Sequence, residues 1–345
     1  MDIFKILMFP GEGDKTFSKP IILEWNKYWT EISYEDYECA ESCIFTKNKT
    51  FEKDATLITF HYPNIILENL PKTINFNRMN VFVSFESPGN YPYPTNLPDN
   101  FFNATISYML NSDYPILYDC FKNLTQNDID RWSDKEIEEI LSKKNKSIVT
   151  FVSNCYTSSK REFLIPVLEK YIPITKYGNC YQSLNNCKLY ENCEKEELEN
   201  HFFVLALENS HCTDYFSEKV WRLKNLIVPI IMDRKLLRKE LSYLNPYIIA
   251  LSDFKTVKGF TEYLIYLMNN KEEYKKYFEW TKFYKKSKTC GILPVLPCKI
   301  CDLALNVKNG YRKEMNARKW WSEGTYEKDY VKTWLKSALI RKYKK

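Results

Sequence analysis

The fold is decided by the stretch HFFVLALENSHCTDYFSEKVWRLKNLIVPIIM, residues 201–232. Its first part is apolar without alternation and breaks off at Glu208. After a short polar loop, apolar residues recur at helical spacing over 214–225, and a second continuous apolar run occupies 226–232. Continuous apolar runs are typical of strands buried on both faces of a parallel sheet. The stretch therefore predicts a strand–helix–strand unit.

Similar apolar runs recur along the 345-residue chain, with helix-like stretches between them. The strand-like runs are 20–25, 56–62, 80–87, 147–154, 201–209 and 226–232, and the helix-like stretches are 159–171, 214–225 and 260–280. Alternating strands and helices predict an α/β architecture. At roughly 150 residues per domain, the length allows two domains. The polar, charged segment 120–146 places their boundary near residue 145.

The charge of the chain fits a small anionic ligand at least as well as a nucleic acid. Lys and Arg outnumber Asp and Glu by 50 to 44, a net charge of +6, and both signs are mixed along the sequence. A nucleic-acid-binding domain is usually more basic, with its charge clustered, so no nucleic-acid partner is expected. With only 8 glycines, and neither GxGxxG nor GxxxxGK[ST], a glycine-rich phosphate loop is not expected.

Cysteines and N-glycosylation sequons together point to an oxidising, secretory compartment. The chain has 11 cysteines and four N-x-[ST] sequons, at Asn48, Asn103, Asn123 and Asn145. This combination favours glycosylation and disulfides, and the odd count leaves at least one thiol free or paired between chains. Chance sequons with free buried thiols are the alternative. No apolar run approaches the ~20 residues that span a bilayer, so a membrane anchor is not evident.

Polar side chains stand at three strand ends, where ligands bind in open α/β sheets. They are Glu86 after one strand, Ser153 and Asn154 after another, and Glu208, Asn209 and Ser210 after a third. Arg161 follows the second of these ends, and Glu218 and Lys219 open the helix-like stretch after the third. Arg161 and Lys219 would clamp a diphosphate, because arginine grips it bidentately and lysine acts as a point charge. A solvated pair of surface charges is the alternative.

A metal site is less well supported by the sequence. The three histidines, His61, His201 and His211, lack metal-binding spacing. Cys298 and Cys301 have the spacing of half a zinc site. The sequons favour a disulfide role for these two cysteines instead.

The segment 151–180, FVSNCYTSSKREFLIPVLEKYIPITKYGNC, followed by 201–232, strongly resembles the α1,3-fucosyltransferases of glycosyltransferase family 10. The second block is similar to that family's signature, in which a strand ends in Glu-Asn-Ser and Asp-Tyr-x-x-Glu-Lys follows. Further matches are FESPGNYPYP at 85–94, FFNATISYMLNSD at 101–113, DFKTVKGFTEYLIYLMNNKEEYKKYFEW at 253–280, CKICDLAL at 298–305 and RKWW at 318–321. The resemblance covers about residues 20–323.

The resemblance implies a GT-B fold, in which two Rossmann-like domains face a cleft. Residues 1–145 would form the acceptor-side domain and 146–295 the GDP-fucose-binding domain. Residues 296–345 would return to the first domain and end in a basic amphipathic helix. The implied reaction is an inverting transfer of fucose from GDP-fucose to the 3-OH of GlcNAc in a glycan. GDP-fucose is then a substrate, and no cofactor is essential, with a divalent metal at most a stimulator.

The resemblance also assigns roles to individual residues of this chain. Glu86 matches the catalytic base, and Glu218 matches a residue near the fucose ring. Arg161 and Lys219 match the diphosphate clamp, and Tyr108 matches a tyrosine that faces the donor. The other positions that match nucleotide contacts are Ser153, Asn154, Glu208, Asn209, Ser210 and Tyr215.

The chain departs from the family's pattern at a few positions. Met109 and Leu110 replace a pair of arginines, and Leu226 and Asp233 replace glycines, which predicts lost cationic contacts and a changed donor pocket. The family also implies a Golgi location with a membrane anchor. The cysteines expected to pair in such a fold are Cys39 and Cys43 with Cys298 and Cys301. A homologue that binds GDP-sugar or glycan without efficient turnover is the alternative function.

Overall fold

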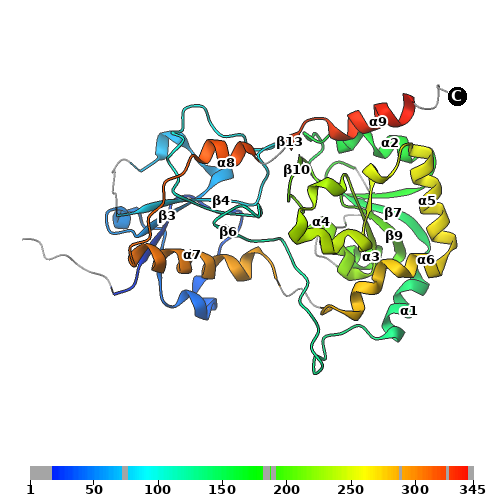
Figure 1. The fold of residues 1–345 in the computed structure, drawn as a ribbon, viewed down its shortest axis with the longest axis horizontal. Helices are drawn as coiled ribbons and strands as arrows, with labels where there is room; N and C mark the ends of the chain where they lie inside the picture. Colours follow the sequence, from blue (N-terminus) through cyan, green and yellow to red (C-terminus); the bar gives the residue numbers. More distant parts are fainter. Residues whose placement is uncertain are drawn as a thin grey trace, which may run out of the picture.

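The protein has two lobes, each built on a parallel β-sheet. A computed structural model describes residues 18–71, 77–181, 187, 192–286, 290–323 and 326–340. The two sheets lie next to each other along the long axis of the molecule (Figure 1). Each sheet carries its own core of buried apolar side chains. The predicted α/β architecture is confirmed.

The first lobe contains a six-stranded sheet of order β2-β1-β3-β4-β5-β6, with every pair parallel. Its strands are β1 (Ile21–Glu24), β2 (Ile44–Thr46), β3 (Leu57–His61), β4 (Met79–Ser84), β5 (Ala104–Ser107) and β6 (Tyr114–Pro115). Every residue of β3 is buried, as expected of a continuous apolar strand at the centre of a sheet. Helices α7 (Ile292–Lys308) and α8 (Ala317–Glu323) add side chains to this core and lie on either side of the sheet in Figure 1.

The second lobe contains a five-stranded parallel sheet of order β12-β11-β9-β7-β8. Its strands are β7 (Lys146–Phe151), β8 (Ile174–Tyr177), β9 (His201–Leu205), β11 (Val228–Ile231) and β12 (Ile249–Ala250). The chain order reverses between β7 and β9, because β8 lies on the outer side of β7. A reversal of this kind opens a crevice at the carboxyl ends of the strands, where ligands bind.

Helices cover both faces of the second sheet. They are α1 (Asp134–Lys143), α2 (Ile165–Leu168), α3 (Asn192–Asn200), α4 (Glu218–Trp221), α5 (Val257–Asn269) and α6 (Lys271–Lys275). The short α4 continues as a 3-10 turn, η7 (Arg222–Asn225). Helix α4 begins directly after Ser217, so its first turn carries Glu218 and Lys219 to the sheet's carboxyl edge.

The C-terminal part of the chain visits both lobes. Residues 296–345 were expected to return to the first lobe, and α7 and α8 pack there. The last helix, α9 (Tyr330–Ile340), packs instead on the second lobe, because its apolar face, with Val331 and Trp334, joins that core. Strand β13 (Tyr326–Glu327) leads into it and pairs antiparallel with β10 (His211–Cys212).

Five disulfides cross-link the chain, three of them between distant segments. They are Cys39–Cys298, Cys43–Cys301, Cys120–Cys290, Cys155–Cys180 and Cys187–Cys193. The first two tie α7 to the loop that precedes β2, and they use the four cysteines expected to pair. Cys212 is the single free thiol among the eleven cysteines, all of which are described, and it is buried. The odd cysteine predicted from the count is therefore this one.

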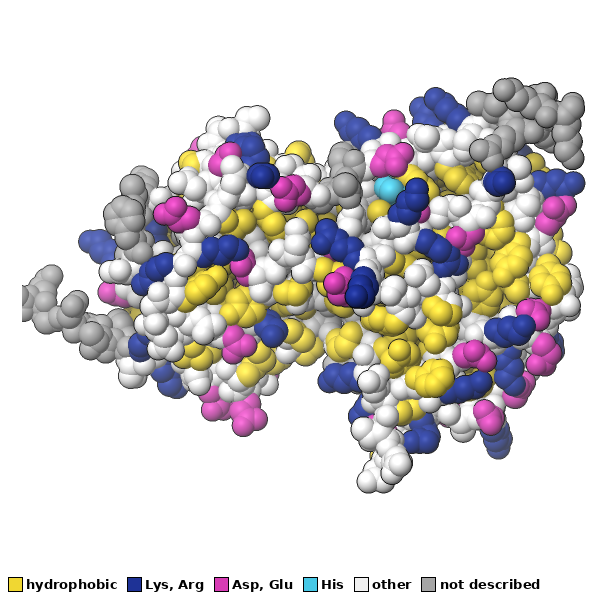
Figure 2. Space-filling model, viewed as in Figure 1, with side chains coloured by type: hydrophobic (Ala, Val, Ile, Leu, Met, Phe, Trp, Pro, Cys, Tyr) yellow, Lys and Arg dark blue, Asp and Glu magenta, His cyan; other side chains and the backbone are white. Residues whose placement is uncertain are grey.

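The surface carries both signs of charge. Figure 2 shows Lys and Arg interspersed with Asp and Glu over both lobes on the face in view. Three of the four sequon asparagines, Asn48, Asn123 and Asn145, are exposed. Asn103 is half-buried, and its Nδ2 donates to the carbonyl of Lys313 at 3.3 Å. Within the described ranges, no helix has the length and apolar character needed to span a bilayer.

Candidate active site

A cavity of about 480 Å³ lies where the two lobes meet. Its wall includes side chains from both lobes and from the segment between them. The lining residues are Trp29, His61, Pro63, Asn64, Phe85, Glu86, Tyr91, Tyr118, Asn209, Tyr215, Ser217, Glu218, Lys219 and Ile292. We call this space the interlobe cavity. It brings Glu86, from the first lobe, into one cavity with Glu218 and Lys219, from the second.

Glu86 is held in place by hydrogen bonds from both lobes. It follows β4, and its Oε2 accepts from Tyr215 Oη at 3.2 Å and from Asn90 Nδ2 at 3.3 Å. Burial raises the pKa of Tyr215, and nearby Tyr118 and Glu86 add to the rise, so the Tyr215 hydroxyl stays protonated and donates. Asn90 also accepts from Ser210 Oγ at 3.0 Å, which links Glu86 to the end of β9. The carboxylate is thus oriented but still half-exposed to the cavity.

Lys219 is bound by a cluster of oxygens at the start of α4. Its Nζ lies 2.7 Å from Ser217 Oγ and 3.1 Å from Glu208 Oε2, and it forms an ion pair of 3.3 Å with Glu218. Glu208 is buried and also accepts from the backbone N–H of Ser217 at 2.8 Å. A carboxylate at a helix N-terminus is stabilised by the helix dipole. Glu208 therefore fixes the position from which Lys219 reaches the cavity.

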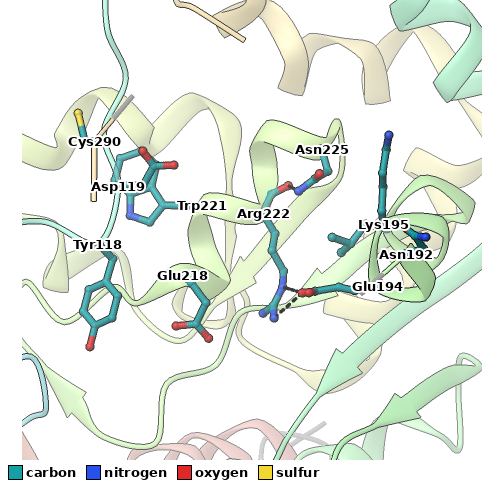
Figure 3. A pocket seen from close by; sticks show the side chains of 11 residues that line it. Tyr118, Asp119, Asn192, Glu194, Lys195, Glu218, Trp221, Arg222, Asn225 and Cys290 are labelled. Carbon is teal, nitrogen blue, oxygen red and sulfur yellow. Dashed lines mark hydrogen bonds and ion pairs between the residues drawn. The ribbon is translucent and has the colours of Figure 1, made fainter. Parts of the chain in front are cut away.

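Glu218 lies between two neighbouring cavities. Burial alone would raise its pKa, but Lys219 and Arg222 outweigh burial and hold the pKa of Glu218 below its usual value. Glu218 and Tyr118 line the interlobe cavity and also a neighbouring cavity of about 350 Å³ between α3 and α4. Figure 3 shows this second space, in which Arg222 donates from Nε to Glu194 Oε1 at 2.9 Å. Glu218 is therefore an ionised carboxylate that two adjacent cavities share.

Arg161 lies behind the cavity wall, outside its lining. The residue is 4% exposed, and its guanidinium donates to the carbonyls of Leu207 at 2.5 Å and Asn154 at 3.2 Å. Its Nε has no hydrogen-bond partner. The guanidinium thus joins the loop after β7 to the end of β9, at the crevice between these strands. Lys219 lines the interlobe cavity and Arg161 does not, so the two-cation clamp stays a prediction.

The sequence and the fold both match known protein families. A model described as "Glycosyltransferase family 10 (fucosyltransferase) C-term" matches residues 141–321, and one described as "Fucosyltransferase, N-terminal" matches 17–119. The chain belongs to glycosyltransferase family 10. The first match alone covers more than half of the chain, and the two together span both lobes, as the resemblance read from the sequence implied.

Individual relatives agree with the family assignment, and a solved structure agrees with the fold. The chain is 31% identical over 277 residues to the α-(1,3)-fucosyltransferase fut-1 of Caenorhabditis elegans, covering 77% of this chain and 60% of that protein. It is 25% identical over 324 residues to the α-(1,3)-fucosyltransferase C of Drosophila melanogaster, covering 87% and 74%. A crystal structure of an α1,3-fucosyltransferase with GDP-fucose superposes with a TM-score of 0.54 at 16% identity, covering 90% of this chain and 95% of that one. The GT-B fold is thereby confirmed.

Leu226 and Asp233, which stand where the family has glycines, differ in backbone conformation. Leu226, which ends η7, keeps the left-handed conformation that a glycine favours, at φ 54° and ψ 45°, with its side chain fully buried. Asp233 has an extended backbone at φ −145°, which any residue adopts. Its Oδ1 accepts from the N–H of Lys235 at 3.0 Å, and its Oδ2 lies 3.6 Å from His211 Nε2. Burial alone would raise the pKa of Asp233, but His211 and Lys235 lower it to about 2.

Met109 and Leu110, which stand where the family has a pair of arginines, pack in the protein interior. Met109 is buried in the first core. The N–H of Leu110 donates to Asp214 Oδ2 at 3.1 Å, and Asp214 pairs with Arg238 at 3.2 Å. These positions therefore serve packing and the contact between lobes.

The other predicted nucleotide-contacting residues fall into two groups. Asn209 and Tyr215 line the interlobe cavity, whereas Glu208 and Ser210 are buried outside its lining. Tyr108 does not line it, because the ring is fully buried against Tyr215 with centroids 4.9 Å apart. Ser153 and Asn154 are exposed on the loop after β7, also outside the cavity lining.

Sequence reasoning missed several cavity residues that belong to no strand end or motif. Trp29 and Tyr118 are the main ones. Asn90, which lies outside the cavity lining but donates to Glu86, was missed as well. Asn90 lies in the matched segment FESPGNYPYP, which is the one signal that could have identified it. In the described part of the chain, no group of three or more His, Cys, Asp or Glu residues could hold a metal ion. The expected metal independence stays a prediction.

Proposed function

We propose that this protein is an inverting α1,3-fucosyltransferase that moves L-fucose from GDP-fucose to the 3-OH of GlcNAc in a glycan. One observation carries the proposal: the Glu86 carboxylate and the Lys219 ammonium, from different lobes, line one cavity. A transfer from a nucleotide sugar to a hydroxyl needs a base at the hydroxyl and positive charge at the departing diphosphate. The interlobe cavity supplies one of each.

In the proposed reaction, the acceptor oxygen attacks the anomeric carbon of fucose from the side opposite the diphosphate. The new C–O bond forms as the bond to the diphosphate breaks, and GDP leaves with the bonding electrons. Glu86 takes the proton of the acceptor hydroxyl. Tyr215 and Asn90 hold Glu86 Oε2, so its other oxygen is available for that proton. A single displacement converts the β-linked donor to an α-linked product.

Lys219 is the proposed contact for the diphosphate. Its ammonium is occupied by Ser217 and Glu208 in the free protein, so a diphosphate must replace at least one of these oxygens. The exchange is feasible because Glu208 keeps two further donors, the N–H and the hydroxyl of Ser217. Glu218, ionised beside Lys219, is the proposed neighbour of the fucose ring, where positive charge develops at the anomeric carbon.

The cellular setting is proposed on the same grounds. Five disulfides and three exposed sequons suit a protein that folds in an oxidising secretory compartment. We propose that it acts in the Golgi lumen on glycoproteins that carry GlcNAc.

The proposal is tested by product formation. Purified protein is incubated with GDP-fucose and with oligosaccharides ending in, or containing, GlcNAc, and GDP release and product mass are followed. A mass gain of one deoxyhexose, with an α1,3 linkage by NMR, supports the proposal. GDP release without product would indicate hydrolysis of the donor, and no release would contradict the proposal.

A second candidate is a homologue that binds GDP-sugar or glycan without efficient turnover. The Arg161 guanidinium favours it, because both of its terminal nitrogens already donate to backbone carbonyls. In that case, calorimetry would show GDP-fucose binding while the assay above shows no product.

A further inference from the structure

Trp29 is exposed in a way that the other tryptophans are not. It follows β1 in the first lobe, lines the interlobe cavity and is 45% exposed. The other seven tryptophans are all described, and each is buried or half-buried. An exposed indole that lines a cavity offers a large apolar surface that a ligand can cover.

The Trp29 ring is held by its neighbours. Tyr28 meets it edge-on with centroids 5.9 Å apart, Phe85 meets it edge-on at 5.5 Å, and His61 lies at 5.4 Å. Phe85 is the residue before Glu86. A rigid aromatic surface loses little conformational entropy when a ligand binds. Trp29 is therefore a fixed surface that contacts Phe85, the residue next to the proposed base.

The surroundings of Trp29 favour a carbohydrate. A pyranose ring has an apolar C–H face and a rim of hydroxyls. The indole offers surface for the face, and Asn64 and Tyr91, on the same cavity wall, carry polar groups for the rim. The proposed diphosphate contact, Lys219, belongs to the other lobe, so the donor's charge does not lie on this wall.

We propose that Trp29 is the stacking platform for an acceptor sugar ring and that it sets acceptor affinity by holding the reacting hydroxyl near Glu86. This inference rests on the proposed function. Trp29 would contact the acceptor and not GDP-fucose. Its substitution should therefore change the KM for the acceptor and leave the KM for GDP-fucose nearly unchanged.

The test compares Trp29→Ala and Trp29→Phe with wild type. Trp29→Ala should raise the KM for N-acetyllactosamine at least tenfold and leave the KM for GDP-fucose within twofold. Trp29→Phe, which keeps a ring, should lie between the two. Tyr266→Ala is the matched control, because Tyr266 is a 47% exposed aromatic on α5 outside the cavity lining, and it should change neither constant.

A binding measurement separates this inference from the proposed function. Saturation-transfer NMR of N-acetyllactosamine with GDP present needs no turnover, and its signals should be strong for wild type and lost in Trp29→Ala. If wild type binds the disaccharide through Trp29 but forms no product, the proposed function fails and the platform stands. An unchanged acceptor KM or NMR signal in Trp29→Ala, equal changes in both KM values, or no disaccharide binding by wild type would overturn the platform.

Discussion

Leu226 offers a quantitative test of the backbone at a position where the family has glycine. Its left-handed conformation is unfavourable for a residue with a Cβ, by about 1–2 kcal/mol. The side chain is fully buried in the second core, and deleting such a leucine to alanine typically costs about 3–5 kcal/mol. Packing therefore outweighs strain, which explains how leucine is tolerated here.

Two substitutions separate these effects. Leu226→Ala removes packing and keeps the strain, so it should lose about 3–5 kcal/mol of unfolding free energy. Leu226→Gly removes both and should lose about 1–4 kcal/mol. The glycine variant should thus be the more stable of the two, by up to about 1 kcal/mol once the greater freedom of glycine in the unfolded chain is counted.

The assay is urea unfolding of the oxidised protein, followed by tryptophan fluorescence. The control is Glu139→Ala against Glu139→Gly on the exposed face of α1, where alanine should be better by about 1 kcal/mol. The order of alanine and glycine should therefore reverse between the two sites. If alanine is also better at 226, the left-handed assignment and the reasoning built on it are refuted.

Three further outcomes are expected. Lys224→Met should lose about 3–5 kcal/mol of stability in thermal unfolding, because it strands the buried carboxylate of Asp119, 3.0 Å from Lys224 Nζ; adding Asp119→Leu should recover most of the loss, and no recovery would count against the pairing. Burial lowers the pKa of His61 from 6.5 to about 4. Between these two values the unfolded chain binds a proton at His61 and the folded protein does not, so the free energy of unfolding falls as the pH drops. Between pH 7 and pH 5, wild type should lose about 2 kcal/mol more than His61→Gln, and equal losses would contradict the burial argument. Lys219→Ala should weaken GDP binding at least tenfold by calorimetry, whereas unchanged affinity would return Lys219 to an ordinary surface charge.

The strands that the sequence predicted are those with the largest apolar content. All six continuous runs correspond to strands, β1, β3, β4, β7, β9 and β11, because burial on both faces leaves no alternation to confuse the pattern. The strands it missed are short or polar. Strand β8 is mostly half-buried, and β5 has the sequence ATIS, in which Thr105 and Ser107 hide a buried strand.

The candidate site was predictable where chemistry coincides with a strand end or a helix start. Glu86, Glu218 and Lys219 satisfy that condition, and they line the interlobe cavity. Trp29 and Tyr118 do not, because they lie in irregular segments whose contacts with the cavity no local pattern records. For Arg161, the sequence spacing predicts a position near the site. The spacing does not predict which carbonyls its guanidinium binds.

Glu86→Gln tests most directly whether Glu86 is the base of a fucosyl transfer in the interlobe cavity. Glutamine keeps the shape and still accepts from Tyr215, but it cannot take a proton at neutral pH. We predict that this variant binds GDP-fucose with wild-type affinity in calorimetry and forms product at least a hundredfold more slowly in a single-turnover assay. Product formation at the wild-type rate would contradict it.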